Sequence, residues 1–170
     1  MPSQGKRTGA AVHDDRGTLD WATVDEVVNR CANALLARDL GTERRVAVYA
    51  ENAAETALAH LGGLLGSTST VPVNFHLAPA EAAYILADSG ADLVFVGPEN
   101  LDAGLAAADK AGVGQVVAWR APARTGVTAW EDWLAAAPAQ APPDNVPPRP
   151  NLLYTSGTTG TPKSVELPPA

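Results

Sequence analysis

Apolar residues recur at steps of three and four in the segment that follows residue 19. Such spacing places side chains on one face of a helix, so an amphipathic helix is predicted here. Its start is open between two signals: Asp20 caps the helix, or Thr23 and Glu26 form a capping box. The apolar positions are Trp21, Val24, Val28, Cys31 and Leu35.

A second helix is predicted after the apolar, β-branched run at residues 45–50. Asn52 with Glu55 resembles a helix start. A buried stripe is then predicted from the leucines at helical spacing, which are Leu58, Leu61 and Leu65.

Short apolar runs alternate with helical segments along the rest of the chain. Pro79 and Gly90 bracket one helix, because proline suits the first helical position and glycine the position just past the end. This alternation predicts an α/β fold with a mainly parallel sheet and flanking helices. The predicted strands cover residues 45–50, 70–73, 92–96, 114–119 and 151–155, and two further helices cover 101–110 and 130–137.

Two stretches follow neither period. Residues 1–16 are polar and are predicted to form a flexible tail, which leaves 17–170 as one domain. Between Pro138 and Pro150 lie six prolines in thirteen residues, so this segment is predicted to be an extended connector. It is either a domain boundary or a surface excursion within one domain, and the strand predicted at 151–155 favours the second.

Charge and composition narrow the possible partners and the compartment. A net charge of −7, from 12 basic and 19 acidic residues, argues against a surface that binds nucleic acid. Cys31 is the only cysteine, so no intrachain disulfide forms, and it is expected to pack as a small apolar side chain. No segment has the apolar core of a signal peptide or the roughly 20 apolar residues of a membrane span. The chain is predicted to be cytoplasmic.

The chemistry is concentrated in a loop rich in glycine and threonine that follows the last predicted strand. Glycines let main-chain N–H groups approach an anion, hydroxyls donate further hydrogen bonds, and a lysine supplies a positive charge. Together these groups suit a polyphosphate. The candidate phosphate-binding residues are Thr155, Ser156, Gly157, Thr158, Thr159, Gly160 and Lys163.

Two other interpretations of this loop compete with a polyphosphate site. It is an ordinary glycine-rich turn with a chance lysine, or it is a Walker A loop, since Gly157 and Lys163-Ser164 have the right spacing. Against a Walker A loop, Pro162 stands where that motif has glycine, and proline removes an N–H donor. Few residues follow Lys163 to build the helix that such a loop opens. A P-loop NTPase is therefore kept as a remote alternative.

The stretch from Tyr154 to Lys163 resembles the phosphate loop of the adenylate-forming, AMP-binding superfamily. Three further stretches support this resemblance in the same order, and together they cover residues 18–167. They are Leu19-Asp20-Trp21, the segment from Gly62 to Asn74, and the segment from Glu81 to Ala91. Within the superfamily, Pro72-Val73-Asn74 and Val165-Glu166-Leu167-Pro168 look most like bacterial acyl-CoA synthetases and fatty-acid–CoA ligases.

The resemblance implies an ATP-dependent ligase that converts a carboxylic acid, expected to be a fatty acid, into acyl-AMP and then a thioester. It implies ATP and Mg²⁺, with CoA as co-substrate of the complete enzyme, and it places no catalytic residue in this stretch. The chain is thus expected to be an N-terminal piece that is inactive alone. The alternative is a non-catalytic binding or assembly module that self-associates or pairs with a C-terminal part.

Two positions depart from the family pattern, and two histidines resemble catalytic bases. Ser164 stands where the family has glycine, and Ala78 stands where it has a Ser or Thr helix cap. If position 164 needs a positive φ, serine there is strained. His60 and His76 have no neighbour in the sequence that marks a triad or a metal site, and packing or surface roles are expected for both.

Overall fold

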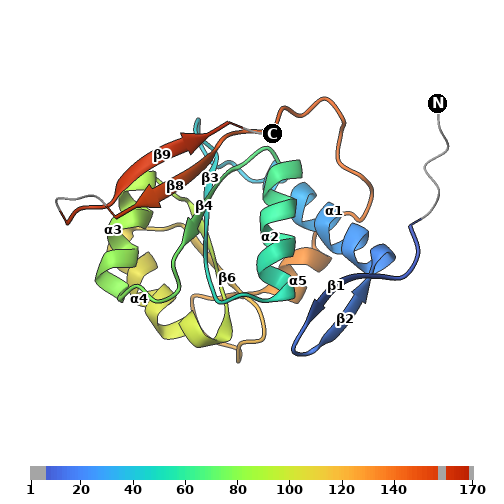
Figure 1. Ribbon diagram of the computed structural model, residues 1–170, viewed down its shortest axis with the longest axis horizontal. Coiled ribbons are helices and arrows are strands. Elements are labelled where there is room, and N and C mark those ends of the chain that lie inside the picture. Colours follow the sequence, from blue (N-terminus) through green and yellow to red (C-terminus); the bar gives the residue numbers. More distant parts are fainter. Residues whose placement is uncertain (1–6, 157–159, 169–170) are drawn as a thin grey trace.

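The computed structural model describes residues 7–156 and 160–168. Its centre is a five-stranded parallel sheet with helices on both faces (Figure 1). The strand order is β4-β3-β5-β6-β7, and every pairing between neighbours is parallel. The strands are β3 (Arg45–Tyr49), β4 (Ser69–Val73), β5 (Leu93–Val96), β6 (Gln115–Ala118) and β7 (Thr128–Ala129). The predicted α/β fold is confirmed.

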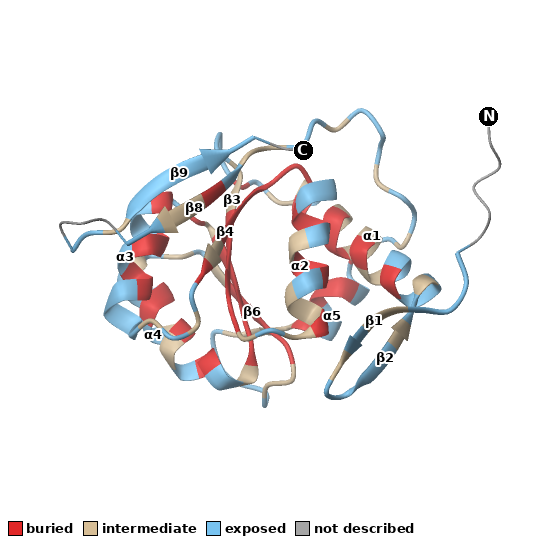
Figure 2. Cartoon of the chain, in the orientation of Figure 1, coloured by how far each residue is buried: buried red, intermediate tan, exposed pale blue. Residues whose placement is uncertain are grey.

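Two helical layers bury the two faces of the sheet (Figure 2). Val46, Val48 and Phe95 point to one layer, whereas Tyr49 and Val94 point to the other, as side chains alternate along a strand. The first layer holds α1 (Trp21–Ala37), α2 (Ala54–Leu65) and α5 (Trp130–Ala135). The second holds α3 (Pro79–Ser89) and α4 (Leu101–Ala111), which follows the short 3-10 helix η1 (Pro98–Asn100).

The start of α1 is decided in favour of Asp20. Its Oδ1 accepts the backbone N–H of Thr23 at 2.8 Å, so Asp20 is the N-cap. The predicted apolar face is buried from Val24 through Leu35, and Cys31 is fully buried within it. Burial raises the pKa of the Cys31 thiol, because a thiolate is poorly solvated there. Cys31 therefore packs as the expected apolar side chain.

The buried stripe predicted for α2 is wrong at two of its three leucines. Leu58 is buried, but Leu61 and Leu65 are 44% and 45% exposed. The buried face passes instead through Gly62 and Gly63, which lie against α1 and β4. These two adjacent glycines let the backbone of α2 approach α1 and β4 closely, and Leu61 and Leu65 therefore face outward.

The predicted flexible tail is also wrong for its second half. Residues Ala10–Asp14 form β1, which pairs antiparallel with β2 (Gly17–Asp20). Val12 packs against the core cluster beneath α1. Asp14 accepts the backbone N–H of Ala54 at 3.1 Å and binds Arg120. These long-range contacts hold a segment whose own sequence carries no periodic signal.

The proline-rich connector lies along α1. Asn33 Nδ2 donates to the backbone carbonyls of Pro138 and Gln140, and Arg30 donates to that of Ala137. These bonds hold the extended segment against a helix surface without adding a strand. Among the described residues, no helix is long and apolar enough to cross a membrane.

The start of α3 lacks half of a capping box. Glu81 Oε2 accepts the Ala78 N–H at 2.8 Å, but alanine has no side-chain acceptor to return a bond to the helix. Ala78→Ser is expected to raise the free energy of unfolding by about 1 kcal/mol, since serine supplies that acceptor. Urea unfolding of the two proteins measures the change. Ala80→Ser, inside the same first turn, is the control and is expected to give no gain; an equal gain there contradicts the capping explanation.

Candidate phosphate-binding loop

The candidate loop connects the two strands of an antiparallel hairpin (Figure 1). These strands are β8 (Asn151–Thr155) and β9 (Lys163–Leu167), and Thr155 pairs with Lys163 at the end of the ladder next to the loop. The strand predicted at 151–155 is confirmed, whereas β9 was not predicted. Gly157, Thr158 and Thr159 lie outside the described residues.

The described residues of the loop bring a lysine and hydroxyl side chains to the place where the loop joins the two strands. Lys163 and Ser156 are exposed, and Thr155 Oγ1 lies 3.4 Å from the carbonyl oxygen of Lys163, to which it donates. Gly160 has φ +83°, a left-handed conformation that favours glycine. The Thr155 hydroxyl thus lies directly opposite the residue that carries the ammonium group, and Ser156 follows it in the chain.

The hairpin excludes the Walker A alternative. In a Walker A loop the lysine opens a helix, whereas Lys163 is the first residue of β9. The same geometry removes the question of strain at Ser164. That residue pairs with Tyr154 in extended backbone and is not among the residues with positive φ.

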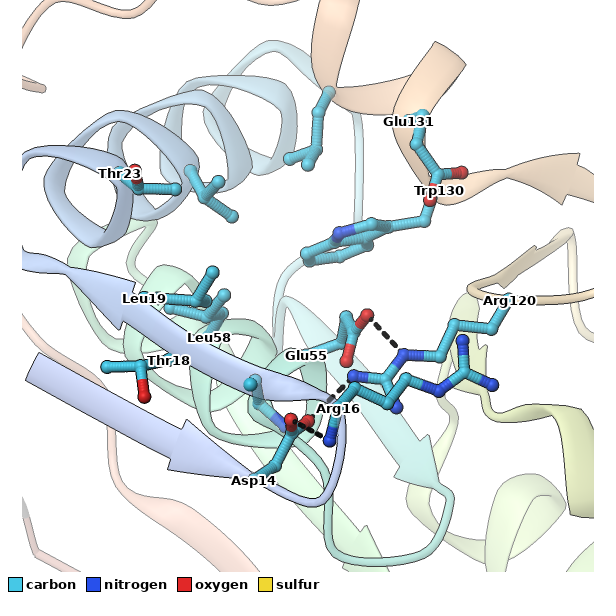
Figure 3. Close-up of a pocket in the computed structure, with 14 residues that line it drawn as sticks. Asp14, Arg16, Thr18, Leu19, Thr23, Glu55, Leu58, Arg120, Trp130 and Glu131 are labelled. Carbon is cyan, nitrogen blue, oxygen red and sulfur yellow. Dashed lines mark hydrogen bonds and ion pairs between the residues drawn. The ribbon is translucent and has the colours of Figure 1, made fainter.

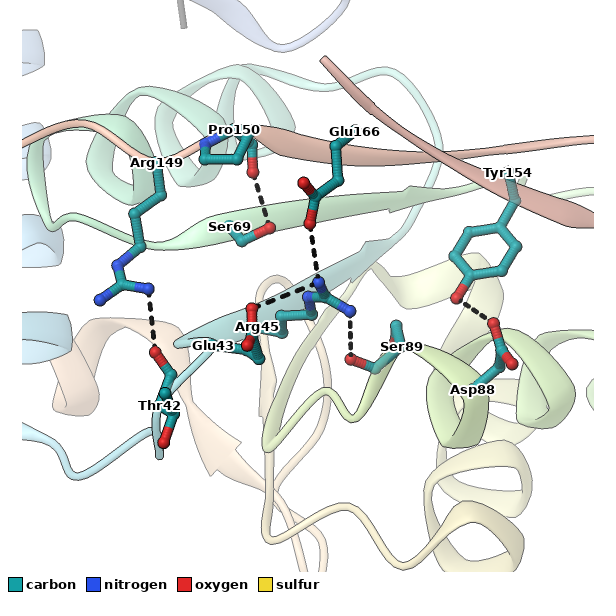
Figure 4. A network of polar contacts seen from close by, with 10 residues as sticks. All are labelled: Thr42, Glu43, Arg45, Ser69, Asp88, Ser89, Arg149, Pro150, Tyr154 and Glu166. Carbon is teal, nitrogen blue, oxygen red and sulfur yellow. Dashed lines mark hydrogen bonds and ion pairs between the residues drawn. The ribbon is translucent and has the colours of Figure 1, made fainter. Parts of the chain in front are cut away.

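Polar contacts attach the hairpin to the rest of the fold (Figure 4). Arg45 of β3 donates through Nη2 to Glu166 Oε1 of β9 at 3.2 Å. Ser69 Oγ donates to the carbonyl oxygen of Pro150 at 2.7 Å, just before β8. Tyr154 Oη donates to Asp88 Oδ2 on α3, also at 2.7 Å. Burial and the neighbouring Asp88 carboxylate raise the pKa of Tyr154, so its hydroxyl stays protonated as a donor.

A hollow of about 350 Å³ lies between the loop and α3. Leu77 and Tyr84 give it an apolar wall, and Glu81 adds a carboxylate already bonded to Ala78. Gly160, Thr161 and Pro162 form its other side. The loop therefore borders a concave surface of the protein rather than a flat one.

A second polar centre lies apart from the loop, between α2 and the β1–β2 hairpin (Figure 3). Arg120 binds Asp14 at 2.7 Å and Glu55 at 2.8 Å, and all three side chains are largely buried. They line a cavity of about 330 Å³ together with Trp130 and other residues of the first helical layer. Arg120 has φ +52°, which is costly for a residue other than glycine.

The histidines are placed as expected from the sequence. His60 is partly buried on α2, and burial lowers its pKa because the charged ring is poorly solvated there. His76 is exposed and lies against the ring of Phe75. Within residues 7–156 and 160–168, no group of three or more His, Cys, Asp or Glu side chains could hold a metal ion.

Sequence reasoning missed the residues that attach the loop. Asp88 and Arg45 lie 66 and 121 positions from their partners Tyr154 and Glu166, and no local pattern links such distant residues. A signal existed only for Tyr154. It follows Leu152 by two positions, so both side chains share the strand face that packs on the fold.

The sequence pattern of the AMP-binding enzyme family matches residues 3–168. A sulfoacetate–CoA ligase of Cupriavidus necator is 39% identical over 161 residues, covering 94% of this chain and 29% of the relative. The long-chain-fatty-acid–CoA ligase FadD13 of Mycobacterium tuberculosis is 34% identical over 152 residues, covering 86% and 29%. A 3-hydroxybenzoate–CoA ligase of Aromatoleum sp. is 30% identical over 167 residues, covering 96% and 32%. The chain thus spans about a third of these relatives.

Solved structures show the same fold. The anthranilate CoA ligase AuaEII superposes with a TM-score of 0.80 at 24% identity, over 93% of this chain and 31% of that one. The N-terminal domain of FACL13 from Mycobacterium tuberculosis gives a TM-score of 0.73 at 29% identity, over 89% and 37%. Sequence pattern, relatives and fold agree, and the chain belongs to the AMP-binding enzyme family.

Proposed function

We propose that the chain supplies the ATP-phosphate-binding part of an adenylate-forming acid–thiol ligase. One observation carries the proposal: the β8–β9 hairpin sets Thr155, which Ser156 follows directly, opposite Lys163 at the base of a single loop. Hydroxyls, main-chain N–H groups and one cation are the groups that bind a polyphosphate without a dedicated metal cage.

In the first half-reaction a carboxylate oxygen bonds to the α-phosphorus of ATP, and the bond to the bridging oxygen breaks. Pyrophosphate leaves and acyl-AMP forms. Lys163 and the hydroxyls of Thr155 and Ser156 would bind the departing β- and γ-phosphates, where negative charge grows in the transition state. In the second half-reaction a thiol, such as that of CoA, attacks the acyl carbon and AMP leaves.

The described residues of the loop carry no carboxylate, so Mg²⁺ would reach this site as a partner of the nucleotide. It binds oxygen ligands and commonly keeps the phosphates of the nucleotide among them. When bound, it would neutralise phosphate charge. The chain's own contribution at the loop would be a cation and hydroxyls, and Lys163 would balance part of the phosphate charge.

The proposed substrate is a carboxylic acid, and a fatty acid is one member of that class. The relatives are named for sulfoacetate, long-chain fatty acids and hydroxybenzoate, which differ in size and polarity. The proposed partner is the remaining part of an AMP-binding enzyme. The exposed strand β9, with Val165 and Leu167 48% and 45% exposed, offers an apolar surface on which such a part packs.

A chimera tests the function. The chain replaces the matching third of the Cupriavidus necator relative, and acid-dependent exchange of labelled pyrophosphate into ATP is measured. Exchange is expected, with Lys163→Ala reducing it at least tenfold, because the lysine acts on the leaving pyrophosphate. A folded chimera whose exchange is unaffected by Lys163→Ala contradicts the proposed role of the loop.

A further inference from the structure

The β8–β9 hairpin lies beside β4 but shares no strand pairing with it. Its strands pair only with each other and join no ladder of the five-stranded sheet. An isolated two-stranded hairpin is marginally stable in water. The position of the loop at its tip therefore depends on side-chain contacts from β8 and β9 to the elements beneath.

The contacts of β8 come from one face of the strand. Leu152 is 3% exposed and packs in the core cluster formed by α3 and α4. Tyr154, two residues later, packs against the same cluster and donates from Oη to Asp88 Oδ2 at 2.7 Å (Figure 4). Of the contacts shown in Figure 4, this one is nearest in sequence to the loop, because Thr155 follows directly.

Strand β9 is held at the same position, because it pairs with β8 next to the loop. Tyr154 pairs with Ser164, and Thr155 pairs with Lys163. An anchor at Tyr154 thus sets the position of the lysine as well as that of the first loop hydroxyls. The acceptor is an exposed carboxylate near the C-terminal end of α3; solvent weakens the bond, but hydrogen bonds to charged acceptors are the stronger kind.

We propose that Asp88 and Tyr154 are positioning residues for the phosphate loop. They fix the end of β8 against α3, so that Thr155, Ser156 and Lys163 face a bound polyphosphate together. The inference rests on the proposed function of the loop. Neither side chain needs to touch the nucleotide for this role.

Tyr154→Phe tests the proposal, since it removes only the hydroxyl. Hydrogen exchange at residues 151–155 and 163–167 is expected to become about tenfold faster, as befits one lost bond to a charged group. Exchange in β3, β4 and β5 stays unchanged. The dissociation constant for Mg²⁺–ATP, measured by calorimetry, rises about fivefold to tenfold because the loop is no longer held in one arrangement.

Matched variants separate positioning from general destabilisation. Asp88→Ala reproduces the effect of Tyr154→Phe, whereas Asp88→Asn keeps an acceptor and recovers most of the affinity and protection. Asp109→Asn, an exposed aspartate of α4, controls for the lost charge and leaves both readouts unchanged.

Unchanged exchange of the hairpin in Tyr154→Phe overturns the proposal. So does faster exchange with unaltered nucleotide affinity, because the anchor then fails to position the loop. A parent chain that binds no Mg²⁺–ATP is a separate result: it contradicts the proposed function, and exchange alone then decides whether Asp88 and Tyr154 anchor the hairpin.

Discussion

Gly62→Ala is expected to lower the free energy of unfolding by about 3 kcal/mol, near the upper end for an overpacked core. A Cβ at this position would lie 2.3 Å from Sγ and 2.6 Å from Cβ of Cys31, far inside van der Waals contact. Cys31 is fully buried in α1, so it cannot swing into solvent to make room. Helices α1 and α2 must separate, which opens the packing of the first helical layer. Urea unfolding measures the loss.

A double-mutant cycle identifies the cause of the stability loss in Gly62→Ala. Cys31→Ala removes the nearest atom, so the cost of Gly62→Ala is expected to shrink by about 1 kcal/mol in that background. An equal cost of Gly62→Ala in both backgrounds would show that another contact, rather than the approach to Cys31, limits this position.

Arg120→Ala is expected to release the β1–β2 hairpin and to lower the melting temperature by roughly 5–10 °C. The guanidinium group binds Asp14 and Glu55, and its loss leaves two enclosed carboxylates without their counter-ion. Calorimetry measures the shift. Arg124→Ala is the control, because its ion pair with Asp102 is exposed and such pairs contribute little. Equal shifts for the two variants would contradict the importance of the enclosed network.

The same network predicts that its contribution to stability depends on pH in the acid range. The Arg120 side chain first, and then the backbone N–H groups of Ala54 and Arg16, hold the pKa of Asp14 well below its ordinary value of 3.8. A lowered pKa in the folded state stabilises the fold above the unfolded value, and that stabilisation is lost as the pH falls below it. The difference in melting temperature between the parent and Arg120→Ala should therefore narrow from about pH 6 to about pH 3.

Most of the sheet could be predicted because its signals are local. The run at β5 is apolar on both faces, and Gly90, with φ +67°, ends α3 where the sequence placed the end. The choice of cap for α1 could not be made from sequence, since Asp20 and Thr23 both suit the position. Only the observed bond from the Thr23 N–H to Asp20 decides it.

The failures have one physical origin, which is long-range packing. Leu61 and Leu65 have helical spacing, but the glycines beside them offer a closer approach to α1 and β4, and this decides which face is buried. Strand β1 depends on Arg120, 106 residues beyond its partner Asp14. In the candidate site, the sequence alone was enough to propose Lys163 as the phosphate-binding cation. The hairpin that places it opposite Thr155 was not, because β9 is exposed at every position and carries no buried face.

Calorimetric titration of Mg²⁺–ATP into the chain, into Lys163→Ala and into Lys110→Ala tests the central claim most directly. Lys110 is an exposed lysine of α4 and controls for the loss of one positive charge. The account predicts weak binding to the parent, binding at least tenfold weaker in Lys163→Ala, and no change in Lys110→Ala. Equal affinities in all three proteins, or no binding to the parent, would contradict a phosphate-binding role for the β8–β9 loop.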